Sequence, residues 1–151
     1  VTTSMMSAAR GLFSDEQETI MRRARHVTNE NARVDQVLRA LKRDDWHAVG
    51  TALSASHVSL RYDYEVSVPE IDALVEIAKG TEGVLGARLM GGGFGGSTLT
   101  LVRRAALPRL TEALVTGYRE RFDREAIVYP VELVDGARVG WVELAEQADD
   151  E

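Results

Sequence analysis

The sequence contains no cysteine, only three prolines and few aromatic residues. Without cysteine the chain cannot form disulfide bonds or use thiol chemistry, and the usual cysteine-based zinc sites are excluded. Its apolar runs are all shorter than the ~18 residues that span a membrane. Residues 1–9 have neither the charged nor the apolar region of a signal peptide. We therefore expect a cytoplasmic protein with no membrane partner.

A basic surface is also missing. The 151 residues include 24 acidic and 18 basic side chains, which gives a net charge of −6, and no basic stripe alternates with aromatic residues. Such a chain is a poor candidate for binding nucleic acid. The three histidines, His26, His47 and His57, lack the paired spacing of metal ligands. The sequence thus predicts no nucleic-acid partner and no metal site, and its length suits one globular domain.

Glycine, by contrast, is concentrated in one short stretch. Five of the six residues from 91 to 96 are glycines, and only Phe94 interrupts them. Each glycine costs ~0.5–1 kcal/mol more backbone entropy on folding than alanine, so stability does not explain the stretch. The flanking segments 83–90 and 98–102 are apolar or alternate with period two, as strands do. We predict a loop between two strands.

This setting argues against the best-known glycine loops. Gly91, Gly93 and Gly96 satisfy G-x-G-x-x-G, but the dinucleotide-binding version leads from a strand into a helix. A Walker A loop ends in Gly-Lys-Ser/Thr, and no lysine is present here; the protein-kinase signatures are missing as well. A loop without lysine can still offer backbone N–H groups to a phosphate or sugar. The alternative is a tight crossover packed against another backbone.

Two segments resemble conserved blocks of galactokinases, which belong to the GHMP small-molecule kinases. Residues 86–102 are similar to the third conserved motif, G-S/A-R-M-T-G-G-G-F-G-G-C-x-V. Residues 56–72 are similar to S-H-x-S-L-R-D-D-Y-E-V-S-x-P-E-L-D. The departures are Leu89, Met90 and Ser97 in the first block and Tyr62 in the second. The resemblance extends from about residue 22 to residue 139.

The resemblance implies that the chain is the carboxy-terminal half of a galactokinase, which transfers the γ-phosphoryl group of ATP, with Mg²⁺, to the anomeric hydroxyl of galactose. The implied partner is a missing amino-terminal GHMP domain with the sugar motif, the phosphate loop and the catalytic Asp and Arg. None of these has a counterpart here, so we assign no catalytic residue and expect the isolated chain to be inactive. The residues expected beside the sugar or phosphate are Gly91, Gly92, Gly93, Phe94, Gly95 and Gly96.

Two other functions remain open. The chain could belong to a non-catalytic galactose sensor on the same fold, in which case the upstream phosphate loop should be damaged. It could also be a freestanding ferredoxin-like module for binding or dimerisation that retains the glycine motif.

Three polar side chains near the motifs are interpreted as structural. His57 has no carboxylate at a fixed spacing and is expected to form hydrogen bonds rather than act as a base. Arg88 is expected to form an ion pair. Asp72 and Glu70 would not face each other two positions apart on a helix, which argues against a catalytic carboxylate pair.

Capping boxes predict the start of two helices. Ser14 and Gln17 precede a helix to about residue 43, and Ser67 and Glu70, with Pro69 in the first turn, precede a helix that ends at Gly80. A further helix between them begins after residue 45. The first helix carries one apolar stripe, formed by Ile20, Ala24, Val27, Val34, Leu38 and Leu41.

Beyond the glycine loop we predict a helix from Pro108 to about residue 122, a strand over 127–133 and a hairpin at residues 135–136 that leads into 138–142. The order of elements indicates an α+β fold, and the resemblance implies a ferredoxin-like antiparallel sheet with helices on one face.

The predicted division of the chain has three parts. Residues 1–13 form a flexible amino terminus, residues 14–142 form the GHMP kinase carboxy-terminal domain, and residues 143–151 form an acidic tail.

Overall fold

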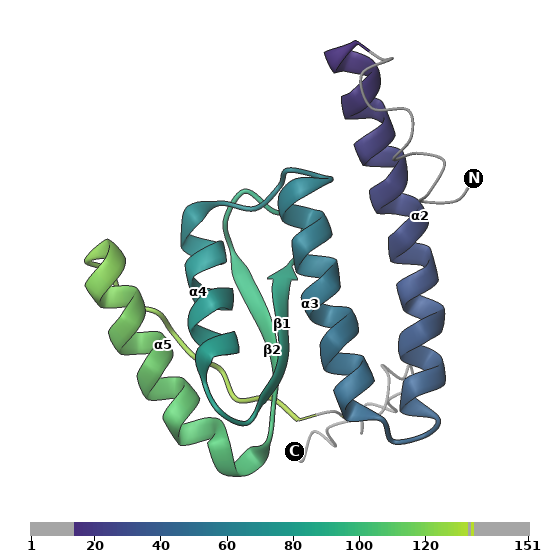
Figure 1. Cartoon of the computed structure of the whole chain (residues 1–151). Coiled ribbons are helices and arrows are strands. Elements are labelled where there is room, and N and C mark those ends of the chain that lie inside the picture. The colour runs from purple at the N-terminus through teal and green to yellow at the C-terminus, as the bar shows by residue number, and fades with distance from the viewer. Residues whose placement is uncertain (1–13, 133, 135–151) are drawn as a thin grey trace, which may run out of the picture.

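The computed structural model describes residues 14–132 and residue 134 (Figure 1). The elements in chain order are helices α2 (Asp15–Leu41), α3 (Trp46–Tyr62) and α4 (Pro69–Gly80), strands β1 (Val84–Met90) and β2 (Ser97–Val102), the short 3-10 helix η1 (Arg104–Ala106), and helix α5 (Leu107–Phe122). The predicted amino-terminal segment 1–13, the hairpin at 135–136 with its strand, and the tail 143–151 lie outside the described residues. None of the described helices has the length and apolarity needed to cross a membrane.

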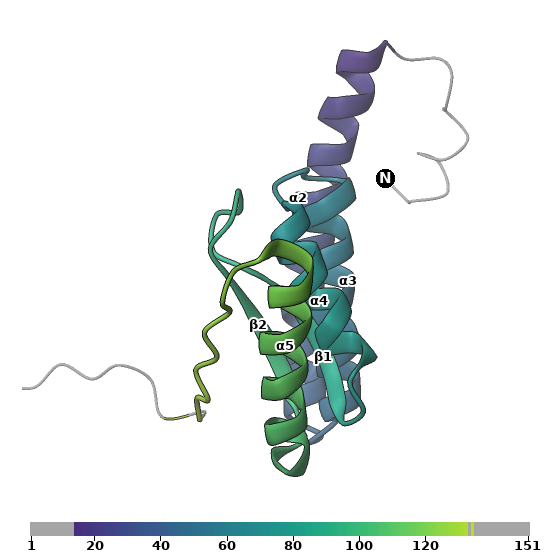
Figure 2. The same ribbon diagram turned by 90° about the vertical axis from the view of Figure 1, so that its left-hand side faces the viewer.

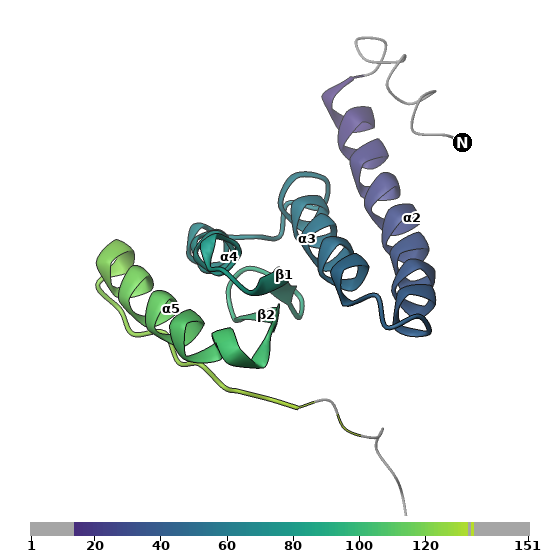
Figure 3. The same cartoon turned by 60° about the horizontal axis from the view of Figure 1, so that its bottom comes forward.

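The two strands form an antiparallel pair around which the helices are arranged. The register runs from Val84 opposite Val102 to Met90 opposite Ser97, with an irregularity between Val84 and Gly86. Helices α3 and α4 contact β1, α5 contacts α4, and α2 contacts α3. Figure 3 shows α2 at one flank, separated from the strands by α3. The predicted α+β class with an antiparallel sheet is confirmed.

Two apolar clusters hold β1 in place. The first joins α4, β1 and α5 through Val75, Ala78, Ala87, Leu110 and Leu114. The second joins α3, the turn after it, α4 and β1 through Leu60, Val66, Ile71 and Leu89. Ala87 and Leu89 are fully buried, so alternate residues of β1 anchor the strand on the helices up to the start of the glycine loop.

Helix α3 and strand β1 touch through their backbones. A Cβ atom on Gly50 would lie 2.2 Å from the carbonyl oxygen of Leu85, and one on Gly86 would lie 2.0 Å from the carbonyl oxygen of Gly50. No side chain fits in either place, so this crossing requires glycine on both elements. The contact fixes α3 alongside β1.

The predicted capping box of α2 is confirmed, and that of α4 is wrong. The Ser14 N–H donates to Gln17 Oε1 at 2.9 Å, and the Gln17 N–H donates to Ser14 Oγ at 3.4 Å. In α4 the residue at the N-cap is Val68, which makes no side-chain cap. The Ser67 hydroxyl donates instead to Asp72 Oδ1 at 2.6 Å, because that carboxylate lies within reach one turn along the helix.

The predicted strand at 127–133 is wrong over the residues described there. Residues 125–132 belong to no helix or strand among the described residues, and Figure 2 shows this segment running past α5. Of the alternating residues behind that prediction, Ile127, Tyr129 and Val131 are all highly exposed, while Val128 packs against the first cluster. Pro130 has no N–H to give to a ladder, which disfavours pairing.

Helix α2 forms as predicted, but its apolar stripe faces outward. Ile20, Val27, Val34 and Leu38 are each more than half exposed, from 53% to 61%. The face that packs on α3 is largely polar, with buried His26 and half-buried Glu30, Arg25 and Arg33, and Ala40 as its buried apolar residue. Periodicity identified the stripe but did not show which side of the helix packs on α3. Nothing in the described part of the chain covers it.

Candidate functional site

The glycine loop connects β1 to β2, as the flanking patterns predicted. Four of its glycines, Gly91, Gly93, Gly95 and Gly96, have positive φ angles between 86° and 125°, and Phe94 has a φ of 59°. Left-handed backbone is costly for residues with a Cβ atom, so most of this loop depends on glycine for its path alone. Of the six loop residues, Gly92 is the one outside the positive-φ region.

The middle of the loop is anchored at Val66. The Phe94 N–H donates to the Val66 carbonyl oxygen at 2.7 Å. A Cβ atom on Gly93 would lie 2.5 Å from the same oxygen and 2.6 Å from Val66 Cβ, whereas one on Gly92 would meet no atom within 4 Å. Gly93 is therefore part of a packed turn, and Gly92 belongs to an open side of the loop.

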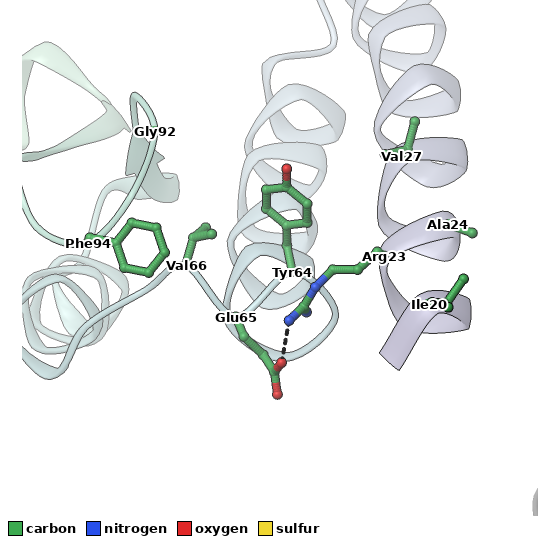
Figure 4. Close-up of a pocket in the computed structure, with 9 residues that line it drawn as sticks. All are labelled: Ile20, Arg23, Ala24, Val27, Tyr64, Glu65, Val66, Gly92 and Phe94. Atoms are coloured by element: carbon green, nitrogen blue, oxygen red, sulfur yellow. Dashed lines mark hydrogen bonds and ion pairs between the residues drawn. The ribbon is translucent and has the colours of Figure 1, made fainter. Parts of the chain in front are cut away.

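A groove of about 840 Å³ runs between this loop and α2 (Figure 4). The phenyl ring of Phe94, which is 77% exposed, forms one wall, and α2 forms the opposite wall. The lining residues are Ile20, Arg23, Ala24, Val27, Tyr64, Glu65, Val66, Gly92 and Phe94. The groove is thus mainly apolar, with one cation and one carboxylate.

That cation and carboxylate are paired with each other. Arg23 Nη2 lies 2.6 Å from Glu65 Oε2, and Arg22 Nη1 lies 3.0 Å from Glu65 Oε1. The hydrogen bond from Arg23 and the charges of both arginines hold the pKa of Glu65 below its ordinary value. Glu65 has a positive φ of 59°, and these two ion pairs support that backbone turn.

Tyr64, beside this pair, is an anchor of the packed helices. Its ring stacks on the buried His26 ring with centroids 4.4 Å apart, and the Arg23 guanidinium lies 5.8 Å from its centroid. His26 Nδ1 in turn lies 3.0 Å from Ser59 Oγ. These contacts engage the Tyr64 ring at the edge of the core.

A buried polar network lies under the loop. His57 Nε2 is 3.3 Å from Asp72 Oδ1, and Asp72 Oδ2 is 2.9 Å from Arg61 Nε. Burial lowers the pKa of His57, and the charge of Asp72 opposes that shift. Glu70 contacts Arg124 at 3.8 Å, so Glu70 and Asp72 serve different partners. His57 forms the predicted hydrogen bonds, although it has a carboxylate partner, Asp72, that sequence spacing did not reveal. Glu70 and Asp72 do not form a carboxylate pair.

Arg88 also has a structural role, as predicted. Its Nε donates to the Leu89 carbonyl oxygen at 2.8 Å, and its Nη1 lies 3.7 Å from Glu30 Oε2. Glu30 also accepts a hydrogen bond from the Ser56 hydroxyl at 2.7 Å. Arg88 therefore joins α2, α3 and β1 beside the glycine loop.

The loop itself presents N–H groups rather than ionisable side chains. Within the ranges that the structure describes, no group of three or more His, Asp or Glu side chains could hold a metal ion. Sequence reasoning missed Val66 as the loop's anchor and Arg23 and Glu65 as part of the groove. A signal existed for two of them, because Glu65 and Val66 lie inside the second block of resemblance. No local pattern marks Arg23.

Comparison with known proteins agrees with this geometry. The family model described as GHMP kinases C terminal matches residues 37–120. The galactokinase of Thermotoga maritima is 44% identical over 120 residues, which are 80% of this chain and 34% of that protein. The galactokinase of Bos taurus is 45% identical over 134 residues, 89% of this chain and 32% of that protein. The chain spans about a third of the length of these relatives.

Solved structures give the same result. The crystal structure of Lactococcus lactis galactokinase complexed with galactose superposes with a TM-score of 0.72 and 36% identity, over 83% of this chain and 32% of that one. The crystal structure of L. major mevalonate kinase in complex with R-mevalonate has a TM-score of 0.52 and 26% identity, over 65% of this chain and 28% of that one. Together with the matched family model, these similarities confirm the resemblance found in the motifs. The chain therefore belongs to the GHMP kinase family, and its residues 37–120 lie in that family's carboxy-terminal domain.

Proposed function

We propose that this chain forms the carboxy-terminal domain of a galactokinase, and that the complete enzyme transfers the γ-phosphoryl group of ATP to the anomeric hydroxyl of galactose. The observation that carries the proposal is the open side of the glycine loop. At Gly91, Gly92, Gly95 and Gly96 an added Cβ would touch nothing in the described chain. The packing of this domain therefore does not explain why these four residues lack side chains.

In the proposed enzyme the loop positions a substrate. Phosphoryl transfer relies on placing the reacting groups and on stabilising charge. Backbone N–H groups along residues 91–96 would donate hydrogen bonds to a sugar hydroxyl or a phosphate oxygen, and the missing Cβ atoms would let it approach closely. The loop would therefore orient the substrate, and no residue of this chain is assigned to the chemical step.

The residues near the loop do not fit a Mg²⁺ site. Protein-bound Mg²⁺ is typically held by one or two carboxylates together with substrate phosphates. Glu65, the carboxylate that lines the groove, is already engaged by Arg22 and Arg23. We therefore derive no step through the metal in this domain, and propose that ATP with Mg²⁺ is held mainly by other parts of the enzyme.

The proposed partner of this domain is an amino-terminal GHMP domain. The outward stripe of α2 and the exposed ring of Phe94 border the same groove, so a single partner seated there would cover both. Contiguous apolar surface of this kind usually marks an interface. Domain interfaces within one chain typically bury about 600–1,500 Å². We also propose a cytoplasmic location for the enzyme.

The test compares this chain with the full-length protein that contains it. Each is purified and assayed with ATP, Mg²⁺ and galactose, and galactose binding is measured by calorimetry. We expect phosphorylation by the full-length protein and none by this chain alone. Galactose binding by the full-length protein without turnover would favour the sensor, and neither binding nor turnover would favour the freestanding module. Turnover by this chain alone would overturn the division of roles proposed above.

A further inference from the structure

We propose that His57 is a positioning residue for the glycine loop, which it holds by accepting a hydrogen bond from the backbone of Leu89. The Leu89 N–H lies 3.3 Å from His57 Nδ1. Leu89 stands two residues before Gly91, where the loop begins. The structural part of this inference is independent of the activity, whereas its kinetic consequence rests on the proposed function.

Leu89 needs this bond because no strand lies on its outer side in the described chain. It is opposite Thr98 of β2, yet its N–H bonds to His57 and its carbonyl accepts from Arg88 Nε. Leu89 is 0% exposed, so water cannot replace either partner. A buried backbone N–H without an acceptor is strongly unfavourable, and the end of β1 would have to move to satisfy it.

The orientation of His57 is fixed from its other side. Because Nδ1 accepts the Leu89 proton, Nε2 carries the ring proton and faces Asp72 Oδ1. Asp72 is held by the Arg61 guanidinium at 2.9 Å and by the Ser67 hydroxyl at 2.6 Å. A continuous set of contacts therefore runs from the first turn of α4, through α3, to the last buried residue of β1.

The loop is thereby fixed at two points. The bond from Leu89 to His57 holds the strand that enters it, and the bond from the Phe94 N–H to the Val66 carbonyl holds its middle. Gly91 and Gly92, on the open side, lie between these points. Losing the first bond would free the strand that enters the loop on the side of α3, and the bond to Val66 would then hold only the middle of the loop.

The bond requires a neutral imidazole, since protonated histidine has no acceptor. The charged groups that act on His57 are Asp72 and Lys79 of α4, Arg61 of α3 and Arg88 of β1. Asp72 favours the protonated ring, and the three cations and burial oppose it, so the pKa of His57 lies below 6.5. The acceptor is therefore present near neutral pH.

Two substitutions separate positioning from packing. His57→Asn keeps an oxygen acceptor where Nδ1 stands, and His57→Leu keeps comparable bulk without an acceptor. In this chain, hydrogen exchange at Leu89 and at Gly91 to Gly96 is measured by NMR. We expect His57→Leu to speed exchange at these amides at least tenfold relative to His57→Asn. Equal exchange in the two variants would overturn the proposal.

In the full-length protein, the same pair is compared by kcat and KM for galactose. We expect His57→Leu to lower kcat about tenfold or more, and His57→Asn to restore most of it. If even the unmodified protein does not phosphorylate galactose while the exchange difference stands, the proposed function fails and the positioning role survives. If the protein is active and the variants exchange alike, the positioning role fails alone.

Should His57→Leu not fold, acid titration of the unmodified chain replaces it. The His57 ring and the amides of Leu89 and Gly91 are followed together by NMR from about pH 8 to about pH 5, around the ordinary histidine pKa. Movement of those amides with the ring, before global unfolding, supports the proposal. Protonation of the ring without movement of the amides contradicts it.

Discussion

Gly93 packs so closely against Val66 that a Cβ atom on Gly93 would lie 2.5 Å from the Val66 carbonyl oxygen. Its neighbour Gly92 would meet no atom within 4 Å if it carried a side chain. Adjacent glycines of one loop are thus present for different physical reasons. Close packing against another backbone accounts for Gly93. It does not account for Gly92, which is free to face a ligand, so the two residues form a natural pair for mutagenesis.

Gly93→Ala should destabilise this chain by about 2 kcal/mol or more, because the new methyl group meets the Val66 backbone and a positive φ disfavours any residue with a Cβ atom. Urea unfolding of the purified chain measures the effect. Gly80→Ala is the matched control, since a Cβ there meets nothing within 4 Å. Equal stability of the two variants would show that the loop adapts to a side chain at Gly93.

Gly92→Val should leave the stability of the full-length protein nearly unchanged and lower its turnover of galactose about a hundredfold or more, or ~2.7 kcal/mol of barrier. The reason is that the isopropyl group would occupy the space proposed for the substrate. Turnover and thermal unfolding are measured side by side, with Gly80→Val as the control. Normal turnover by Gly92→Val would remove the open side of the loop from the site.

The outward stripe of α2 should make the isolated chain self-associate at high concentration. Leu38→Lys should return it to a monomer, because it places a charge within the stripe, where Leu38 is 53% exposed. Sedimentation velocity over a concentration series measures this. Gln36→Lys adds the same charge to an exposed position of the same helix, away from the stripe. A strict monomer for the unmodified chain, or equal effects of both lysines, would contradict the prediction.

Acid should weaken the fold through His26 and His57. Burial holds the pKa of both below the ordinary 6.5, so the unfolded chain binds protons first as the pH falls. Their contribution to the free energy of unfolding is thus fully present above about 6.5 and is lost as the pH falls through the lower folded-state pKa values. Urea unfolding across this range measures it. His57→Asn should reduce the change of the free energy of unfolding with pH. If that change is the same in the variant, His57 is not its source.

Local patterns correctly predicted the helices and the two strands that flank the glycine loop. The capping box at Ser14, Pro69 in the first turn of α4 and the alternation after Ser97 each depend on neighbours within a few residues, which sequence displays directly. The same holds for the resemblance, whose two blocks span the loop and the turn that anchors it.

The failures concern partners distant in the sequence. A stripe on α2 predicts that something apolar covers it, but periodicity does not say whether that partner is α3 or another part of a larger protein. Alternation at residues 127–131 could not reveal that Val128 packs against the α4–α5 cluster. The contact of Gly93 with Val66 was also invisible, since those residues are brought together only by the packing of the second cluster.

The contact of Gly50 with Gly86 also determines how the sheet can grow. Helix α3 occupies the outer edge of β1, with its backbone against Leu85 and His57 on the Leu89 N–H. An incoming strand from another molecule would find those backbone groups already taken, and edge-to-edge pairing is a common route to aggregation. Two missing side chains thus protect the β1 side of the sheet in the described part of the chain, which leaves β2 as the edge open to a further strand.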